Sequence, residues 1–213
     1  MTDQNIVFEP KDRGWRGSAS LWLDGAHALL IEGGVEAVKI GPLATRLGLS
    51  RTSFYWHFAD REALLAALID RWRDTNTRGL VARIGAEYPT ITSAILALFD
   101  AWVDPKLFDS AAEFAMRTWA LTDPALERAL MHEDEARIAA LTDLFLRYGY
   151  SAAEADTRAR TVYLTQVGYI TLRSAEPVDA RMSRIAAYAL IFTGVAPKPE
   201  EVQAFLARHD SAV

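Results

Sequence analysis

The chain has 213 residues, 51 % of them apolar, and a formal net charge of −5. This length permits one or two domains with a buried core, and the absence of cysteine excludes disulfides, thiolate metal sites and cysteine catalysis. The first residues lack the apolar run of a signal peptide, and no stretch of roughly 18 apolar residues could span a membrane, so we expect a cytoplasmic protein.

The acidic net charge conceals one basic segment, residues 39–61. Its basic residues are Lys39, Arg46, Arg51 and Arg61. The only acid in the segment is Asp60, which leaves a local charge of +3. A protein with an acidic body and one small basic face can bind DNA through that face.

Residues 1–17 are predicted to form a flexible arm, because proline and glycine interrupt any helical pattern. Arg13 and Arg16 of this arm either remain solvated or contact phosphate or the minor groove of DNA. A first helix is predicted from Ser18 or Ser20 to about residue 32, where two glycines end it.

Residues 42–58 have the pattern of a helix-turn-helix. A short helix over 42–47 is followed by Gly48, which permits a sharp turn, and by Leu49 as a buried plug. Ser50 is predicted to cap a second short helix over 51–58. The alternative interpretation is an ordinary corner between two helices.

The second short helix and its flanks supply the candidate groups for DNA binding. Arg51 can form a bidentate pair with guanine, and short hydroxyl side chains can contact bases or phosphate. The remaining candidates in this segment are suited to contacts with phosphate oxygens. The candidate DNA-binding residues are Lys39, Arg51, Thr52, Ser53, Tyr55, His57 and Arg61.

The remainder of the chain also has helical patterns, separated by proline and glycine. Further helices are predicted over residues 61–82, 92–103, 107–121, 124–148, 151–174, 179–192 and 199–208. No strand pattern, repeat or flexible linker interrupts them. The fold is therefore predicted to be all-α, with a first domain over residues 18–65 and a second over 66–213.

The run LATRLGLSRTSFYWHFADREALL, residues 43–65, resembles the DNA-binding domain of the TetR family of bacterial transcriptional regulators. The quartet Tyr-Trp-His-Phe and the following Arg-Glu-x-Leu-Leu are its most specific parts, and the resemblance covers about residues 18–70. It implies that the positions of Arg51, Thr52, Ser53, Tyr55, His57 and Arg61 contact DNA. The family often has threonine or a basic residue entering the first of the two helices, where this chain has Ile-Gly-Pro at 40–42.

The resemblance also implies that the C-terminal helices bind a ligand and form a dimer. Residues 161–172 are apolar on nearly every side, which indicates burial on more than one face. With the helix over 179–192 they are the candidate dimer-forming pair; the alternative is a core helix within one subunit. The candidate interface residues are Gly168, Leu172, Ala186 and Leu190.

A ligand pocket is predicted where aromatic side chains surround a lone amide, although each aromatic residue could instead be ordinary core. The candidate pocket residues are Phe99, Trp102, Phe114, Trp119, Phe145, Tyr163, Gln166 and Tyr169. The cluster His132 to Glu135 is interpreted as a solvated face rather than a metal site, and no cofactor is expected. No hydrolase, dinucleotide or phosphate-loop motif is present.

The sequence therefore predicts a homodimeric, ligand-responsive regulator of transcription and no enzyme. We expect it to bind a palindromic operator in double-stranded DNA as a repressor, and to be released by a partly apolar small molecule. Two alternatives remain at this point. One is an activator with the same DNA-binding module, and the other is an all-helical ligand-binding protein or enzyme that does not bind DNA.

Overall fold

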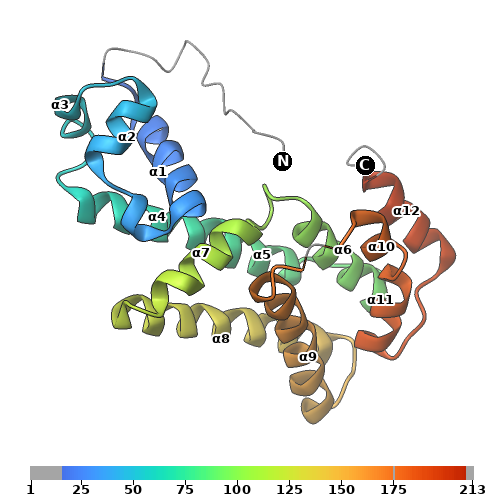
Figure 1. Ribbon diagram of the computed structural model, residues 1–213. Helices are drawn as coiled ribbons and strands as arrows, with labels where there is room; N and C mark the ends of the chain where they lie inside the picture. Colours follow the sequence, from blue (N-terminus) through green and yellow to red (C-terminus); the bar gives the residue numbers. More distant parts are fainter. Residues whose placement is uncertain (1–15, 175, 210–213) are drawn as a thin grey trace. The chain divides into compact units, whose positions relative to one another are not determined.

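The computed structural model describes residues 16–174 and 176–209. These residues form helices and no strands, which confirms the predicted all-α fold (Figure 1). The chain divides into two compact units, residues 1–71 and 72–213. The arm predicted for residues 1–17, including Arg13, lies almost entirely outside the described residues. Within the described ranges, no helix is long and apolar enough to cross a membrane.

The N-terminal unit consists of short helices at the places where the sequence predicts helices, although α3 and α4 end earlier than predicted. They are α1 (Ala19–Gly33), the 3-10 turn η2 (Val35–Ala37), α2 (Ile40–Leu47), α3 (Arg51–Phe54) and α4 (Arg61–Trp72), whose last residue belongs to the C-terminal unit. Ser18 caps α1 by accepting a hydrogen bond from the backbone N–H of Leu21 at 3.1 Å. Gly34 ends α1 with a positive φ of 71°.

The core of this unit holds α3 against α1. The rings of Trp22 and Phe54 are both fully buried and meet edge to face with centroids 5.4 Å apart. Gly25 lets α2 approach α1 closely, because a Cβ atom at this position would lie 2.8 Å from the Leu43 side chain. The helix-turn-helix is therefore anchored to α1 by close packing.

The C-terminal unit contains the remaining helices. They are the π-helical segment η3 (Arg73–Gly79), α5 (Leu80–Gly85), α6 (Ile91–Val103), α7 (Ser110–Ala120), α8 (Pro124–Arg147), α9 (Ala152–Thr171), α10 (Val178–Met182), α11 (Ile185–Thr193) and α12 (Pro199–His209). One hydrophobic core joins α5, α6, α8, α9, α11 and α12. The predicted helix over 179–192 is broken in two at Ser183 and Arg184.

The predicted helix over 61–82 is interrupted by a π-helical segment, η3. In a regular α-helix consecutive side chains diverge by about 100°, so Asn76 and Thr77 could not easily serve the same buried site. A π-helical turn contains extra residues and changes which side chains share a face. Both side chains are buried in η3 and both bind the polar cluster described next.

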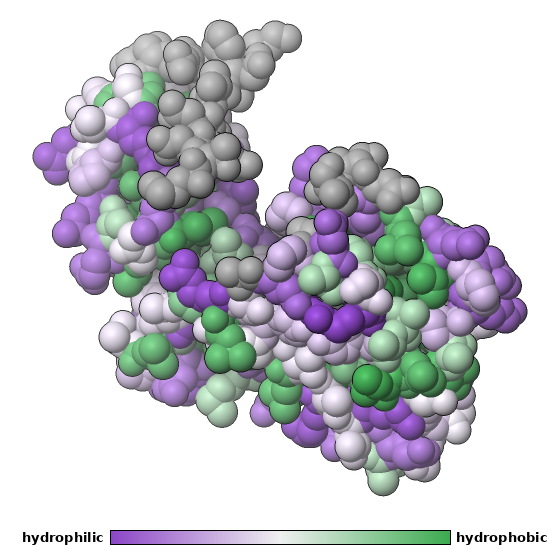
Figure 2. Space-filling model, turned by 45° about the vertical axis from the view of Figure 1, so that its right-hand side comes forward, coloured by the Kyte–Doolittle hydropathy of each residue, from purple (hydrophilic) through white to green (hydrophobic). Residues whose placement is uncertain are grey.

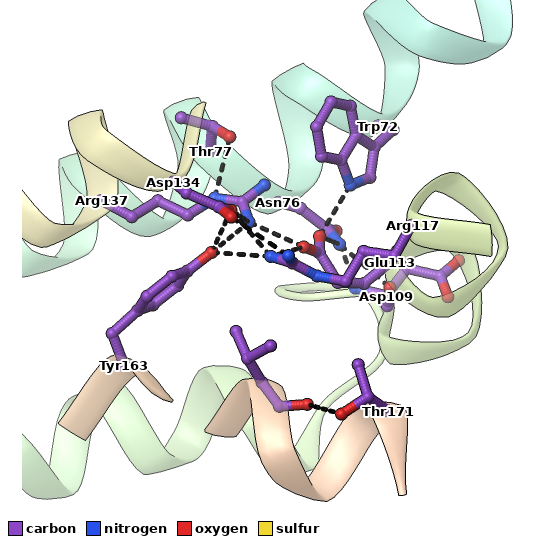
Figure 3. Close-up of polar contacts among 11 residues, drawn as sticks. Trp72, Asn76, Thr77, Asp109, Glu113, Arg117, Asp134, Arg137, Tyr163 and Thr171 are labelled. Atoms are coloured by element: carbon purple, nitrogen blue, oxygen red, sulfur yellow. Dashed lines mark hydrogen bonds and ion pairs between the residues drawn. The ribbon is translucent and has the colours of Figure 1, made fainter. Parts of the chain in front are cut away.

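A buried polar cluster joins η3, α7, α8 and α9 (Figure 3). At its centre the Glu113 carboxylate has no exposed surface and accepts hydrogen bonds from Arg137 and Arg117, both at 2.8 Å. Its second oxygen accepts from Trp72 Nε1 at 2.7 Å and from Asn76 Nδ2 at 2.9 Å. These bonds satisfy a carboxylate that could not otherwise remain charged inside the protein.

The hydroxyl of Tyr163 completes the cluster from α9. It accepts hydrogen bonds from Arg117 and Arg137, both at 2.9 Å, and donates one to Asp134 at 2.5 Å. Burial and the neighbouring acids raise the pKa of Tyr163 although both guanidinium groups oppose this, so the hydroxyl remains protonated as a donor. Two carboxylates and two guanidinium groups leave the cluster electrically neutral.

We expect Glu113→Gln to lower the free energy of unfolding by about 3–5 kcal/mol, because two buried guanidinium groups lose their shared anion. Burial raises the pKa of Glu113, but Arg137 and Arg117 outweigh burial and hold this pKa below its ordinary value. The stability that the carboxylate contributes is therefore present above the ordinary glutamate pKa of about 4.3 and is lost as the pH falls through the lower folded-state value.

Urea unfolding at about pH 7 and about pH 3 measures both effects. The exposed Glu135 of α8 provides the control Glu135→Gln. If Glu113→Gln and Glu135→Gln had equal stability and the same pH dependence, the central role of the buried carboxylate would be refuted.

Candidate DNA-binding surface and ligand cavity

The turn of the helix-turn-helix has the predicted geometry. Gly48 ends α2 in the left-handed region, with φ 66° and ψ 29°, and Ser50 caps α3 by accepting from the Ser53 N–H at 3.2 Å. The helix α3 ends at Phe54 rather than Phe58 as predicted. Beyond it the N–H of His57 bonds to the carbonyl of Phe54 at 2.9 Å, which tightens the chain into a turn.

Four of the seven candidate DNA-binding side chains lie exposed around the start of α3. Arg51 and Thr52 occupy its first turn, Tyr55 is 57 % exposed, and Lys39 is exposed just before α2. The first residues of a recognition helix are those that reach base edges in a major groove. These four side chains are therefore accessible for the contacts with bases or phosphates that the sequence predicts.

Ser53 differs from the other candidate DNA-binding residues because its side chain is buried. Ser53 is only 1 % exposed, and its hydroxyl lies 2.7 Å from that of Ser50. The side chain faces the interior of the unit, beside the cap residue Ser50. Its hydroxyl supports the cap of α3.

His57 and Arg61 are partly engaged within the protein. Nε2 of His57 lies 3.2 Å from the backbone oxygen of Arg16. Arg61 donates from Nε to the carbonyl of Val38 at 2.6 Å and from Nη2 to that of Val35 at 2.7 Å. An arginine has five N–H donors, so Arg61 retains donors for phosphate, but its first role is to hold η2.

Two further interactions alter the expected charge and shape of this surface. Arg46 pairs with Glu32 of α1 through two hydrogen bonds of 2.6 and 2.7 Å, so it adds little to the basic face. These bonds hold the pKa of Glu32 below its ordinary value. Arg16 stacks on the exposed Trp56, with its guanidinium carbon 3.7 Å from the ring centroid. The Arg46–Glu32 pair could not be predicted from local sequence patterns, because its members lie 14 residues apart.

A small cavity in the C-terminal unit lies among α6, α9, α10 and α11. Its enclosed volume is about 40 Å³, and the hollow including its open mouth holds about 360 Å³. The lining residues are Phe99, Trp102, Thr165, Gln166, Tyr169, Arg181, Ile185, Tyr188 and Phe192. Phe99, Trp102, Gln166 and Tyr169 are thus four of the eight pocket residues that the sequence predicts.

The other four predicted pocket residues do not line this cavity. Phe145 is fully buried in the hydrophobic core and Tyr163 belongs to the polar cluster. Trp119 is buried in α7, and Phe114 packs beside Arg173, 5.4 Å from its guanidinium carbon. Aromatic content alone does not distinguish core from cavity, because both require large apolar side chains.

The polar groups of the cavity converge on one side. The hydroxyls of Tyr169 and Tyr188 lie 2.6 Å apart, and the guanidinium carbon of Arg181 lies 5.0 Å from the Tyr169 ring centroid. The hydrogen bond with Tyr169, together with burial, raises the pKa of Tyr188. Arg181 and Tyr188 were not among the pocket residues predicted from the sequence. Their place in the cavity depends on how α10 and α11 pack against α6 and α9.

The candidate dimer residues lie on an apolar face formed by α9 and α11, which pack together. Leu172 is 81 % exposed and Leu190 is 45 % exposed. Leu164 and Ile191, on the same two helices, are also exposed apolar side chains. Gly168 and Ala186 are partly exposed. Apolar side chains at the surface of the C-terminal unit are visible in Figure 2. Exposed apolar residues on neighbouring helices mark an interaction surface.

Residues 23–68 match the family model of bacterial regulatory proteins, tetR family. Among the curated proteins, none matches the chain significantly. Within the described residues, no group of three or more His, Asp and Glu side chains could hold a metal ion.

Solved structures similar to this chain include GusR of Salmonella enterica, with 18 % identity and a TM-score of 0.61 over 90 % of this chain and 99 % of that one. AmtR of Mycobacterium smegmatis is similar with 21 % identity and a TM-score of 0.59, over 95 % and 98 % of the two chains. A putative TetR-family regulator of Mesorhizobium loti has 19 % identity and a TM-score of 0.55, over 89 % and 95 %. These likenesses show a shared fold.

We expect Arg51→Ala to weaken binding to the preferred DNA sequence by roughly 1–3 kcal/mol and to relax base preference at one position. The side chain is exposed at the first position of α3, so its removal leaves the fold intact. Competition binding against single-base variants of the site measures both effects. Equal discrimination by the wild type and the variant would exclude base reading by Arg51.

Arg61→Ala is expected to have two effects. Loss of two hydrogen bonds to η2 should lower the thermal stability of the protein, and loss of a phosphate contact should weaken binding to all DNA sequences and flatten the salt dependence. Calorimetric unfolding and salt titrations of DNA affinity separate the two effects. A loss restricted to one sequence would contradict the phosphate role, and unchanged stability would contradict the role in holding η2.

Proposed function

We propose that this chain, a TetR-family protein by its N-terminal domain, is a dimeric transcriptional repressor that leaves its operator when a small molecule binds to the C-terminal unit. The observation that carries the proposal is the exposed start of α3. Arg51 and Thr52 project from a capped helix that follows a tight turn at Gly48. This is the arrangement by which a recognition helix presents side chains to a major groove.

The form of the operator follows from geometry if two subunits bind together. A two-fold symmetric dimer would place two copies of α3 in successive major grooves, about 34–36 Å apart or a multiple of this distance. The operator would then be nearly palindromic. Lys39, Tyr55, His57 and Arg61 would fix the register by contacting phosphates, and Arg51 and Thr52 would read bases. Because it acts on operator DNA, we place the protein in the cytoplasm.

The apolar face of α9 and α11 supports the proposed homodimer. Leu172 and Leu190 are too exposed to contribute to the core of one subunit, and their burial in a symmetric interface would be favourable. A groove of about 390 Å³ beside Ile191 adds concave surface to the same helices. The sequence-based alternative, a core helix within one subunit, does not explain these exposed leucines.

The aromatic cavity supports the proposed response to a ligand. A ligand can shift the protein only by binding one conformation better than the other, and DNA then changes ligand affinity by the same factor. The helix that begins at Arg61 continues through η3, whose Asn76 binds the buried polar cluster. We propose that this continuous helix transmits the change.

Fluorescence anisotropy with DNA from upstream of the protein's own gene tests the proposal. We expect salt-dependent, sequence-selective binding by a dimer, and reversal by a ligand of the cavity. Transcription in vitro from the same DNA distinguishes repression from activation. Weak binding without sequence selectivity would refute a regulatory role and would favour a helical ligand-binding protein.

We expect Gly168→Leu to weaken the dimer. No atom lies within 4 Å of a Cβ placed at Gly168, so the added side chain starts in open space, and we expect its bulk to obstruct the partner subunit. The exposed Ala139 of α8 provides the control Ala139→Leu, which adds similar bulk elsewhere. Sedimentation equilibrium measures the dissociation constant of each variant. A Gly168→Leu dimer as stable as the wild type would show that the interface lies elsewhere.

A further inference from the structure

We infer that the cavity among α6, α9, α10 and α11 binds a small aromatic carboxylate with one ring and a second polar group. This inference names the class of effector and so rests on the proposed ligand response. Three observations carry it: an arginine without an acidic partner, an amide that lines the cavity and has no hydrogen bond among the described residues, and a wall of aromatic rings.

Arg181 supplies the positive charge. No carboxylate of the described residues lies within 4 Å of its guanidinium group, and the neighbouring Asp179 on α10 is two positions away and faces elsewhere. The other charges near the tyrosine pair, Arg184 and Glu176, form an ion pair with each other. The cavity therefore has one surplus positive charge, held by the face of Tyr169 rather than by an anion.

This arrangement favours a carboxylate over a neutral group. A guanidinium stacked on an aromatic ring keeps its N–H edge available, and that edge matches the two oxygens of a carboxylate. The Tyr169 and Tyr188 hydroxyls share one hydrogen bond of 2.6 Å, so one hydroxyl hydrogen of the pair remains for a ligand. Both donor groups point to an anionic ligand.

Gln166 supplies a second polar contact. The residue is only 5 % exposed and lines the cavity, yet its side-chain amide has no hydrogen-bond partner within residues 16–174 and 176–209. The amide atoms are accessible from the cavity, where a hydroxyl or carbonyl group of a ligand can bond to them. Gln166 thus favours ligands with a polar substituent besides the carboxylate.

The walls and the size of the cavity define the rest of the ligand. Phe99, Trp102 and Phe192 are aromatic, and the Phe99 and Trp102 centroids lie 5.4 Å apart. Such walls bind a flat ring by stacking and edge contacts. The enclosed part of the cavity is only about 40 Å³, and the 360 Å³ of the hollow includes space open to solvent, so a ligand larger than a single ring would extend beyond the aromatic walls.

Isothermal titration calorimetry on the full chain without DNA tests the inference. The probes are benzoate and the three hydroxybenzoates, with benzamide as the neutral isostere and acetate as the anion without a ring. We expect the aromatic carboxylates to bind, the hydroxybenzoates most tightly, and both controls to bind at least about 10-fold more weakly. Absence of aromatic carboxylate binding up to about 10 mM, or equal binding of benzamide, would overturn the inference.

Variants locate the two polar contacts. Arg181→Gln should reduce carboxylate affinity roughly 10- to 100-fold and leave benzamide unaffected, whereas Arg181→Lys keeps the charge and should retain part of the affinity. Gln166→Leu should abolish the preference for hydroxybenzoates over benzoate. The exposed Arg128 of α8 provides the control Arg128→Gln, with the same loss of charge. Equal losses in Arg181→Gln and Arg128→Gln would overturn the assignment.

A parallel titration on DNA-bound protein separates this inference from the proposed function. If aromatic carboxylates bind and leave DNA affinity unchanged, the site is established and the ligand-responsive repressor is refuted. If the protein binds its operator selectively but no aromatic carboxylate binds, the regulator stands and the inference about the ligand is wrong.

Discussion

The buried carboxylate of Glu113 is the constraint on which the C-terminal unit depends. A charge with no exposed surface persists only if every oxygen is satisfied, and here two guanidinium groups, an indole and an amide do so. The partners come from the end of α4, η3, α7 and α8, and Tyr163 of α9 closes the cluster. A shift of any one of these helices leaves a buried charge incompletely paired. The cluster therefore specifies one arrangement of these helices, in a way that hydrophobic packing alone would not.

This constraint explains the π-helical segment and relates it to the cavity. The segment η3 turns Asn76 and Thr77 towards the cluster at the cost of regular helical geometry. On α9, Tyr163 of the cluster and Gln166 of the cavity are three residues apart and therefore lie on neighbouring parts of one helix face. A ligand that moves Gln166 would act on the same helix that supplies the Tyr163 hydroxyl, and the response of a neutral, densely hydrogen-bonded cluster would be a change between discrete arrangements.

Local rules predicted much of the fold, and long-range pairing limited the prediction of the sites. Helical periodicity, the cap at Ser50 and the glycine at 48 depend on near neighbours, so the helix-turn-helix could be located correctly. Burial of Ser53 depends on how a four-residue helix packs, and the roles of Glu113 and Arg137 depend on partners far along the chain. Charged residues at helical spacing normally indicate a solvated face. The same limit applies to the cavity, where Arg181 meets aromatic residues from three other helices.

The N-terminal unit couples α4 to the recognition helix through its own hydrogen bonds. Arg61 at the start of α4 holds the carbonyls of Val35 and Val38, and Arg71 near its end pairs with Asp24 of α1. Close packing at Gly25 and Trp22 fixes α1 to α2 and α3. Displacement of α4 should therefore carry α3 with it as a rigid body. In a dimer, such a movement would change the distance between the two copies of α3 without altering the helix-turn-helix itself. Binding to a palindromic operator would depend on this distance, because it must match the spacing of the two half-sites.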